Sequence, residues 1–206
     1  MLIVISGNIA TGKTTLAGRL AERLSAVRIE EDVSSNEFLG DFYFDMTRWA
    51  FHSQVSFMAA RVRGIRETLE RPQTAILDRS LDEDFFVFAR NLHRLGHLSE
   101  REYRLLFELR SLLAVSLPKP ALWIFLFDEP RAIFDRLMHR GNAYESKIEL
   151  SYIETLNQLY EKWRQSLPRN EVLEIRTSER DFRTDEGFEA VYSLIRNAAH
   201  AHNLPA

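Results

Sequence analysis

The sequence contains no cysteine among its 206 residues, and this absence removes several kinds of chemistry at once. Disulfide bonds, thiolate metal sites and cysteine nucleophiles are all excluded. A chain without cysteine suits a reducing compartment, so we expect a cytoplasmic protein.

Long hydrophobic runs and a strong net charge are also missing. The longest apolar run, Ala121 to Phe127, is far shorter than the roughly 20 residues of a membrane span. The apolar start, Met1 to Ser6, is too short for a signal-peptide core and lacks a basic flank. The formal net charge is −3, so no global basic field attracts nucleic acid. We therefore expect no membrane or nucleic-acid partner, and an anionic ligand needs a local positive site.

What the sequence does contain is an ordinary globular composition, with 45% hydrophobic and 28% charged residues. It shows no repeat or linker, so we expect one domain over residues 1–206. Five apolar segments are typical of strands: Leu2–Ser6, Val27–Glu31, Thr74–Asp78, Ala121–Phe127 and Glu171–Ile175. Three of them are nearly continuously apolar, as in parallel strands that are covered on both faces. Their alternation with helical segments predicts an α/β fold with a five-stranded parallel sheet.

The segments between the strands have helical periodicity. Ser99 with Glu102 three residues later, and Pro130, are typical of helix starts, whereas Pro72 ends a helix. The expected helices begin at Gly12 or Lys13 and then cover residues 45–71, 83–95, 99–116, 130–139, 152–166 and 185–201.

The most specific motif runs from Gly7 to Thr14 and matches G-x-x-x-x-G-K-[ST], directly after a strand and at the start of a helix. A glycine-containing turn with an incidental lysine is the alternative, but this context favours a phosphate-binding loop. Lys13 would bridge the β- and γ-phosphates of ATP, and Thr14 would ligate Mg²⁺. The expected phosphate-binding residues are Gly7, Asn8, Ile9, Ala10, Thr11, Gly12, Lys13, Thr14 and Thr15.

Asp78 ends an apolar strand, where a carboxylate can hold Mg²⁺ beside the phosphate loop. An ordinary strand-end aspartate in a turn is the alternative. Arg79 and Ser80, which follow it, make the motif more specific. These motifs predict nucleotide binding but do not choose between kinases, switches and motors.

Three acids, Glu30, Glu31 and Asp32, follow the second strand, where ligands bind in open α/β sheets. One of them could accept the proton of an attacking hydroxyl, although a solvated acidic loop is the alternative.

Two polar residues, Gln54 and Arg61, lie in an otherwise apolar stripe on the helix after Asp45. A planar base would satisfy Gln54, Asp84 could pair with Arg61, and Phe57 could line a base slot. The alternative is that both polar residues bond to backbone groups or lie at the edge of the helix.

Arg136 and Arg140 lie four residues apart, on one helical face, before Gly141. They could close over a triphosphate as part of a lid at about residues 136–149. A solvated basic helix end is the alternative.

Together these motifs resemble the deoxynucleoside kinase family, especially its bacterial deoxyadenosine and deoxyguanosine kinases. The similarity covers most of the chain. Beyond the phosphate loop it includes Glu31-Asp32-Val33, Asn36-Glu37-Phe38-Leu39, Phe42-Tyr43, Arg48-Trp49-Ala50-Phe51, Gln54, Asp78-Arg79-Ser80, Arg140-Gly141, Glu145, Tyr152 and Asp181-Phe182.

The resemblance implies a role for each matching residue. Glu31 would be the general base, with Glu30 as the alternative, and Arg79 would steady this carboxylate and the transferring phosphoryl group. Tyr43 and Glu145 would bind the 3′-hydroxyl of the sugar.

On the base side, the resemblance implies that Gln54 reads the base edge and that Arg61 and Asp84 form a pair typical of members that accept purines or cytosine. Arg136 and Arg140 would be lid arginines. Asp181 and Phe182 would belong to the adenine-binding loop.

The chain departs from the family pattern at several positions. Asp32 and Glu37 replace prolines, and Asn142 replaces a third lid arginine. Family members are usually homodimers, which the apolar Trp49, Val55 and Phe57 allow.

The sequence therefore predicts an ATP- and Mg²⁺-dependent kinase that phosphorylates the 5′-hydroxyl of a purine deoxynucleoside or deoxycytidine. A nucleoside monophosphate kinase, such as a thymidylate kinase, needs a basic clamp where this chain has acids. A GTPase-like switch needs an Asn-Lys-x-Asp element, which the sequence lacks. A catalytically idle P-loop protein is opposed by the complete set of Lys13, Thr14, Asp78 and Arg79.

Overall fold

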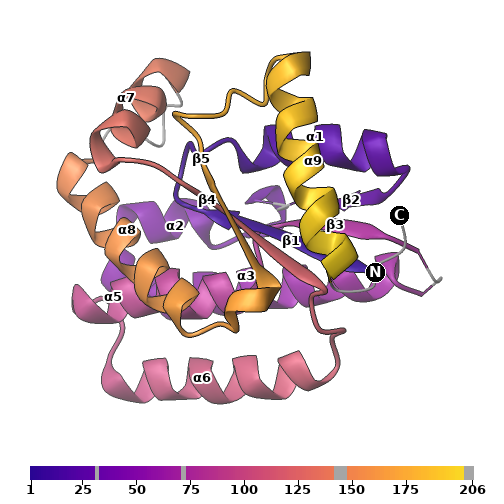
Figure 1. The fold of residues 1–206 in the computed structure, drawn as a ribbon. Coiled ribbons are helices and arrows are strands. Elements are labelled where there is room, and N and C mark those ends of the chain that lie inside the picture. The colour runs from indigo at the N-terminus through magenta and orange to yellow at the C-terminus, as the bar shows by residue number, and fades with distance from the viewer. Residues whose placement is uncertain (31–32, 71–72, 142–147, 202–206) are drawn as a thin grey trace.

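A five-stranded parallel sheet forms the centre of the computed structural model, which describes residues 1–30, 33–70, 73–141 and 148–201 (Figure 1). The strands are β1 (Leu2–Gly7), β2 (Val27–Ile29), β3 (Ala75–Asp78), β4 (Leu122–Phe127) and β5 (Val172–Arg176). Their order is β2-β3-β1-β4-β5, and Ile3 of the central strand pairs with Ile76 on one side and Leu122 on the other. The predicted fold class is confirmed.

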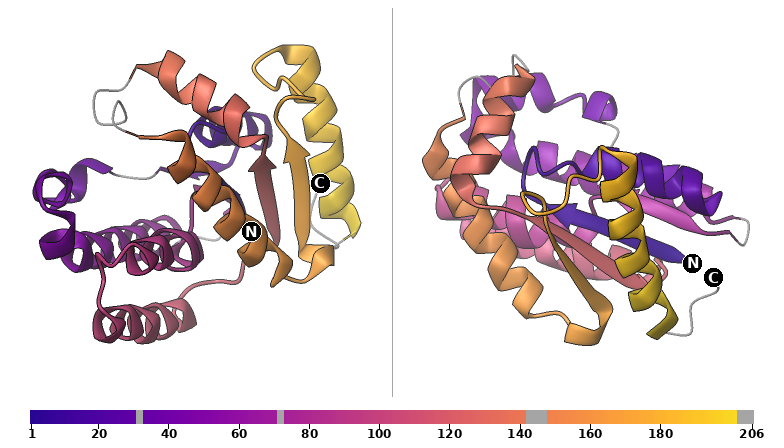
Figure 2. Two further views of the ribbon diagram at one scale, coloured as in Figure 1. Left: turned by 90° about the vertical axis from the view of Figure 1, so that its left-hand side faces the viewer. Right: turned by 45° about the horizontal axis from the view of Figure 1, so that its top comes forward.

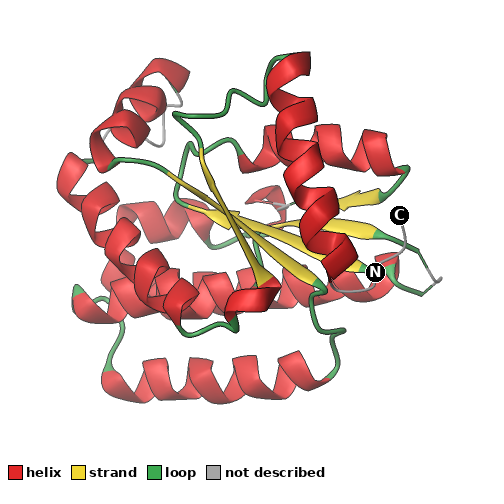
Figure 3. Ribbon diagram, viewed as in Figure 1, coloured by secondary structure: helices red, strands yellow, loops and turns green. Residues whose placement is uncertain are grey.

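Helices surround this sheet (Figure 3). They are α1 (Lys13–Leu24), α2 (Leu39–Phe44), α3 (Met46–Thr68), α4 (Leu81–Glu83), α5 (Arg90–Arg94), α6 (Glu100–Val115), α7 (Pro130–Arg140), α8 (Leu150–Gln165) and α9 (Asp185–Ala201). Shorter pieces are η1 (Val33–Ser35), the π-helical η2 (Asp84–Ala89) and η4 (Arg169–Glu171). In the described part of the chain, no helix is both long and apolar enough to cross a membrane.

Alternating side chains of β1 point to two separate cores. Ile3 and Ile5 pack with residues of α1 and α9 on one face, whereas Leu2 and Val4 pack with residues of α3 and α8 on the other. Figure 2 shows these helix pairs on opposite sides of the sheet. Burial on both faces explains why the central strands are apolar at nearly every position.

Helix α6 lies outside this arrangement, at the bottom of Figure 1, and packs on α3 and on the helical segment 81–94. Its buried Leu106 belongs to a third core that includes Met58 of α3 and Phe85 of η2. The predicted start at Ser99 is confirmed, since Ser99 and Glu102 form a capping box.

Two predicted elements differ from the observed ones, and one observed helix was not predicted. Strand β2 ends at Ile29, because it is an edge strand and pairs with β3 only over residues 27–29. The single helix expected over 83–95 is instead α4, a π-helical turn and α5. Helix α2 was not predicted, because none of its residues is buried and no apolar stripe marks it.

Candidate active site

The phosphate loop joins the carboxyl end of β1 to α1, and two glycines determine its path. Gly7 has a φ of +147°, and a Cβ there would lie 2.2 Å from the carbonyl oxygen of Leu126. Gly12 has a φ of +91°, and its Cβ would lie 2.9 Å from the ring of Phe182. Side chains rarely adopt such backbone angles, so this loop path requires glycine at both positions.

Lys13 lies inside this loop, with only 6% of its surface exposed. Its Nζ donates to the carbonyl oxygens of Gly7 and Asn8 at 2.8 and 2.9 Å. The ammonium group is therefore already at the centre of the loop, where the amino end of α1 adds partial positive charge. A phosphate group that binds in this loop would contact the Lys13 ammonium without a rearrangement of the lysine side chain.

Two oxygen ligands suitable for Mg²⁺ lie beside the loop. The hydroxyl of Thr14 donates to the Asp78 carboxylate at 2.6 Å, and Asp78 is buried at the end of β3. Mg²⁺ binds few protein oxygens and completes its shell with water and phosphate oxygens. The pair fits this requirement.

Asn8 connects the phosphate loop to α8. Its amide nitrogen donates to the carbonyl of Ile153 at 3.0 Å and to the side-chain oxygen of Asn157 at 2.6 Å. Asn157 in turn donates to the backbone carbonyl of Asp128 at 3.0 Å. Sequence reasoning missed Asn157; its place beside the buried, apolar face formed by Ile153, Leu156 and Tyr160 was the available signal.

Arg79 occupies a constrained position directly after Asp78. Its φ is +68°, and its backbone N–H donates to Ile5 of β1 at 3.1 Å. A non-glycine residue in this region costs about 1–3 kcal/mol, and such residues concentrate at functional sites. The guanidinium lies over the Phe88 ring, 4.6 Å from its centre, and 3.6 Å from the Glu83 carboxylate.

On α3, the predicted polar pair inside an apolar stripe is present. Arg61 binds Asp84 at two points, with Nε–Oδ2 at 2.6 Å and Nη2–Oδ1 at 3.0 Å, and both side chains are buried. Arg61 also donates to the backbone carbonyl of Asp78 at 3.3 Å. Gln54 is buried, and its Oε1 has no hydrogen-bond partner among the described residues. Phe57 is half-buried on the same helix.

Tyr152 at the start of α8 brings further elements to this region. Burial raises the pKa of Tyr152, and Tyr43 of α2 raises it further, while the nearby side chain of Asn91 and the charge of Arg79 lower it. Tyr43, half exposed, and Arg79 thus both lie within electrostatic range of Tyr152, and the sugar-binding role of Tyr43 stays a prediction. Sequence reasoning assigned no role to Tyr152 or Asn91.

The first of the two predicted lid arginines is held by an acid at the end of β4. Arg136 donates to Asp128 at 2.9 Å, and the hydroxyl of Thr177 donates to the same oxygen at 2.8 Å. Burial raises the pKa of Asp128, but hydrogen bonds from Thr177, Ser178, Arg136 and the Glu129 amide outweigh it, so the pKa lies below the usual value. Arg140 is exposed at the end of α7.

The predicted adenine loop lies against the phosphate loop. Phe182 is buried, and its ring packs on Gly12. Arg183 donates twice to the exposed Asp181, at 2.7 and 2.8 Å, and these hydrogen bonds lower the pKa of Asp181 to about 2. Arg19 of α1 fixes the loop by donating to the carbonyl of Arg183 at 2.7 Å.

Several predicted residues are not placed in the site. Glu30 is exposed and forms an ion pair with Arg28. Glu31, Asp32, Asn142 and Glu145 lie outside the described residues, as does most of the predicted lid segment after Gly141. The choice between Glu31 and Glu30 as base therefore stays a prediction.

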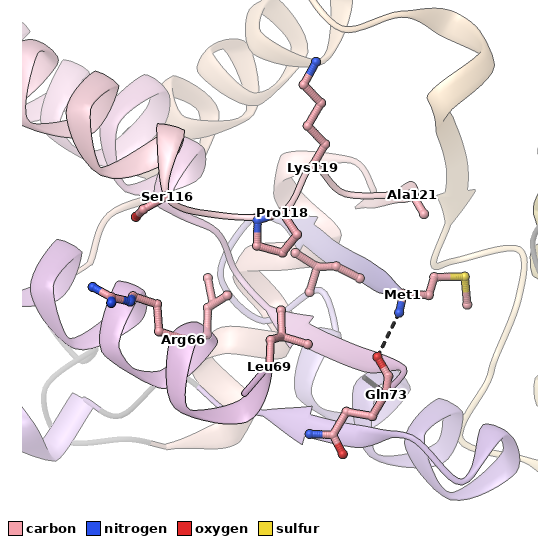
Figure 4. A pocket seen from close by; sticks show the side chains of 10 residues that line it. Met1, Arg66, Leu69, Gln73, Ser116, Pro118, Lys119 and Ala121 are labelled. Atoms are coloured by element: carbon pink, nitrogen blue, oxygen red, sulfur yellow. Dashed lines mark hydrogen bonds between the residues drawn. The ribbon is translucent and has the colours of Figure 1, made fainter. Parts of the chain in front are cut away.

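A separate cavity of about 610 Å³ lies at the other end of the sheet (Figure 4). It is lined by Leu2, Gln73 and Ala121, each at the amino end of a strand or just before one, and the amino group of Met1 donates to the Gln73 carbonyl at 2.8 Å. The phosphate loop follows the carboxyl end of β1. This cavity is therefore not part of the candidate site.

A family model for deoxynucleoside kinases matches residues 3–198 of the chain. The chain belongs to the deoxynucleoside kinase family. Two relatives from Bacillus subtilis (strain 168) align over nearly their whole length. A deoxyadenosine/deoxycytidine kinase is 30% identical, with 97% of this chain and 93% of the relative covered. A deoxyguanosine kinase is also 30% identical, with 98% and 96% covered.

The fold of this kinase is also found in solved structures. A deoxyadenosine kinase from M. mycoides, described with dCMP and a flexible dCDP bound, superposes with a TM-score of 0.82 at 23% identity. The alignment covers 96% of this chain and all of the other. The family model and the two relatives, rather than this shared fold, show that the chain is a deoxynucleoside kinase and not a monophosphate kinase, a switch or an idle P-loop protein.

Proposed function

We propose that this deoxynucleoside kinase transfers the γ-phosphoryl group of ATP, bound with Mg²⁺, to the 5′-hydroxyl of a purine deoxynucleoside or deoxycytidine. One observation carries the proposal. Arg61, which holds Asp84 in the base region, also donates to the backbone of Asp78 in the phosphate site. With these assignments, the donor and acceptor sites would meet at the end of β3.

The donor side follows from the phosphate loop. Lys13 and the loop N–H groups would hold the β- and γ-phosphates, and Thr14 and Asp78 would supply the protein ligands for Mg²⁺. Bound Mg²⁺ would neutralise phosphate charge. Arg136 and Arg140 of α7 would contact the triphosphate, and Asp181 and Phe182 would contact the adenine of ATP.

The acceptor side depends on the open oxygen of Gln54. Its Oε1 can accept from an exocyclic amine while its Nε2 donates to an adjacent ring nitrogen, as amides do when they read adenine. Adenine and cytosine both present an amine next to an unprotonated ring nitrogen. The names of the two Bacillus subtilis relatives, which span deoxyadenosine, deoxycytidine and deoxyguanosine, agree with this substrate range.

The chemical step is an in-line displacement. The 5′-oxygen forms a bond to the γ-phosphorus, the bond from that phosphorus to the β-bridging oxygen breaks, and ADP leaves. Glu31 takes the proton of the 5′-hydroxyl, with Glu30 as the alternative base. Arg79 and Lys13 stabilise the charge on the moving group, and Tyr43 and Glu145 hold the sugar.

A homodimer is part of this proposal. Leu105, Leu112 and Val115 of α6 are 51%, 74% and 86% exposed, and α6 packs beside α3, which carries Trp49, Val55 and Phe57. An apolar surface of this kind marks a protein interface. Light scattering of the wild type and of Leu112→Glu tests the homodimer: we expect the wild type to be a dimer and the substitution to shift it toward monomer.

We expect the enzyme in the cytoplasm.

The direct test is ADP formation from ATP and Mg²⁺ with deoxyadenosine, deoxyguanosine, deoxycytidine, thymidine, the ribonucleosides and the monophosphates. The variant Lys13→Met, purified in the same way, controls for contaminating kinases. Turnover of a purine deoxynucleoside or deoxycytidine, lost in the variant, supports the proposal. Turnover of monophosphates alone, or equal rates for ribonucleosides, contradicts it.

A further inference from the structure

Glu83, at the end of α4, is a completely buried carboxylate with no role in the reaction described above. Tyr160 of α8 donates to its Oε1 at 2.5 Å, and Nη1 of Arg79 lies 3.6 Å from the same oxygen. Its Oε2 has no hydrogen-bond partner in the described part of the chain. Burial of an acid is costly, so its surroundings should explain its presence.

The electrostatic surroundings of Glu83 are those of the phosphate site. Burial raises the pKa of Glu83, while the charges of Arg79 and Lys13 and the hydrogen bond from Tyr160 lower it. Both cations expected to hold the transferring group therefore act on this one carboxylate.

The π-helical segment brings two contacts to Arg79. Glu83 lies directly before this segment and Phe88 five residues further on, and both contact the Arg79 guanidinium. In an α-helix, residues five apart point about 140° away from each other. A π-helix bonds residues five apart and so brings them closer to the same side of the helix. The π turn thus lets a carboxylate and an aromatic face hold the same guanidinium.

Helix α8 fixes this arrangement relative to the phosphate loop. Tyr160 binds Glu83, and Asn157, three residues earlier on the same helix, binds Asn8 of the loop at 2.6 Å. Residues three apart share one helix face. A single face therefore connects the loop that holds the phosphates and the acid that contacts Arg79.

We propose that Glu83, itself held by Tyr160, is a positioning residue that keeps the Arg79 guanidinium oriented toward the transferring phosphoryl group. The inference rests on the proposed function, in which Arg79 contacts that group. An arginine side chain loses rotamer freedom when it is ordered, so an enzyme that orders it in advance retains more of its transition-state stabilisation.

The test is a double-mutant cycle with Glu83→Gln and Arg79→Ala, measured by steady-state kinetics at saturating ATP and deoxynucleoside. Glu83→Gln keeps the size and an acceptor for Tyr160 but removes the charge. We expect kcat to fall roughly 10- to 100-fold, with both KM values changed less than about threefold. In the Arg79→Ala background, Glu83→Gln should change kcat by less than about twofold.

Two further variants separate positioning from general loss of structure. Tyr160→Phe should also lower kcat, by roughly 2- to 10-fold. This variant keeps the inference testable if Glu83→Gln does not fold. The neighbouring Asp82, which binds Arg110 of α6 at 2.6 Å, gives the matched control Asp82→Asn, expected to retain kcat within about twofold.

Two outcomes overturn the inference: an effect of Glu83→Gln on kcat that persists in the Arg79→Ala background, and a folded Glu83→Gln enzyme with wild-type kcat. In either case, a wild type that phosphorylates deoxynucleosides leaves the proposed function in place. A wild type that turns over no deoxynucleoside overturns the proposed function itself, and the inference with it.

Discussion

The guanidinium of Arg61 and the carboxylate of Asp84 form a two-point ion pair in which both side chains are at most 5% exposed. Such a pair is surrounded by protein rather than water, so the loss of one partner leaves a buried charge without its ion-pair partner. The pair crosses from α3 to the π-helical segment, and Arg61 also reaches the end of β3. The contribution of the Arg61–Asp84 pair to stability can be measured separately from its contribution to base selection.

We predict that Arg61→Met and Asp84→Asn each lower the free energy of unfolding by about 3–5 kcal/mol, the usual cost of breaking a buried pair from one side. The double variant Arg61→Met with Asp84→Leu should recover most of this loss, because neither charge then remains. Urea unfolding followed by circular dichroism measures both effects. Single variants within about 1 kcal/mol of the wild type would show that the pair is solvated in solution.

Substitution of Gln54 should have little effect on stability and a large effect on catalysis. Because its Oε1 has no partner among the described residues, Gln54→Leu should leave stability unchanged or raise it slightly. We expect kcat/KM for deoxyadenosine or deoxycytidine to fall roughly 10- to 100-fold, the value of one good two-point base contact, while KM for ATP stays constant. Steady-state kinetics and thermal unfolding provide the two measurements. A variant that binds the deoxynucleoside normally contradicts the assignment of Gln54 to the base.

Two kinds of feature were predictable from the sequence because a local pattern determines them. The phosphate loop is such a case: its glycines, Lys13 and Thr14 lie within one short motif, and the strand and helix around it follow from residues next to it. The stripe that places Gln54 and Arg61 on one buried face follows from helical periodicity in the same way.

The features that sequence analysis missed depend on contacts between distant segments. Asn8 meets Asn157, Tyr160 meets Glu83, and Asp128 meets Thr177, each across at least 49 residues of sequence. No periodicity marks these pairs, because each partner is a single polar residue whose position depends on how whole elements pack. The π-helical turn was missed for a related reason. Its hydrogen bonds depart from the regular α-helical pattern, and the tertiary contacts of Asp84 with Arg61 and of Phe88 with Arg79 accompany this departure.

The phosphate loop should not accept a side chain at Gly12. In Gly12→Ala, a φ of +91° and a Cβ placed 2.9 Å from the Phe182 ring add backbone strain to a steric clash. We expect a loss of about 1–3 kcal/mol in unfolding free energy and weaker ATP binding by calorimetry. Adding Phe182→Leu should relieve the clash but not the strain, so only part of the loss returns. An alanine variant with full stability and affinity would contradict this account of the loop.

The last prediction concerns pH and the junction at Asp128. Hydrogen bonds from Thr177, Ser178, Arg136 and the Glu129 amide outweigh the effect of burial and hold the pKa of Asp128 below its usual value. A carboxyl whose pKa is lower in the folded state stabilises the fold above its unfolded pKa, and this stabilisation is lost as the pH falls through the folded pKa. Asp128→Asn should therefore be less stable than the wild type near neutral pH, and the difference in unfolding free energy should shrink below about pH 4, where the unfolded carboxyl protonates. Urea unfolding of both proteins at a series of pH values measures this difference.

The control is Asp135→Asn, at an exposed ion pair with Arg131 on α7, which should differ little from the wild type in stability at any pH. A constant difference between Asp128→Asn and the wild type across this range would mean that the charge of Asp128 contributes nothing, and that its hydrogen bonds hold Arg136 and Thr177 whether or not the carboxyl is ionised.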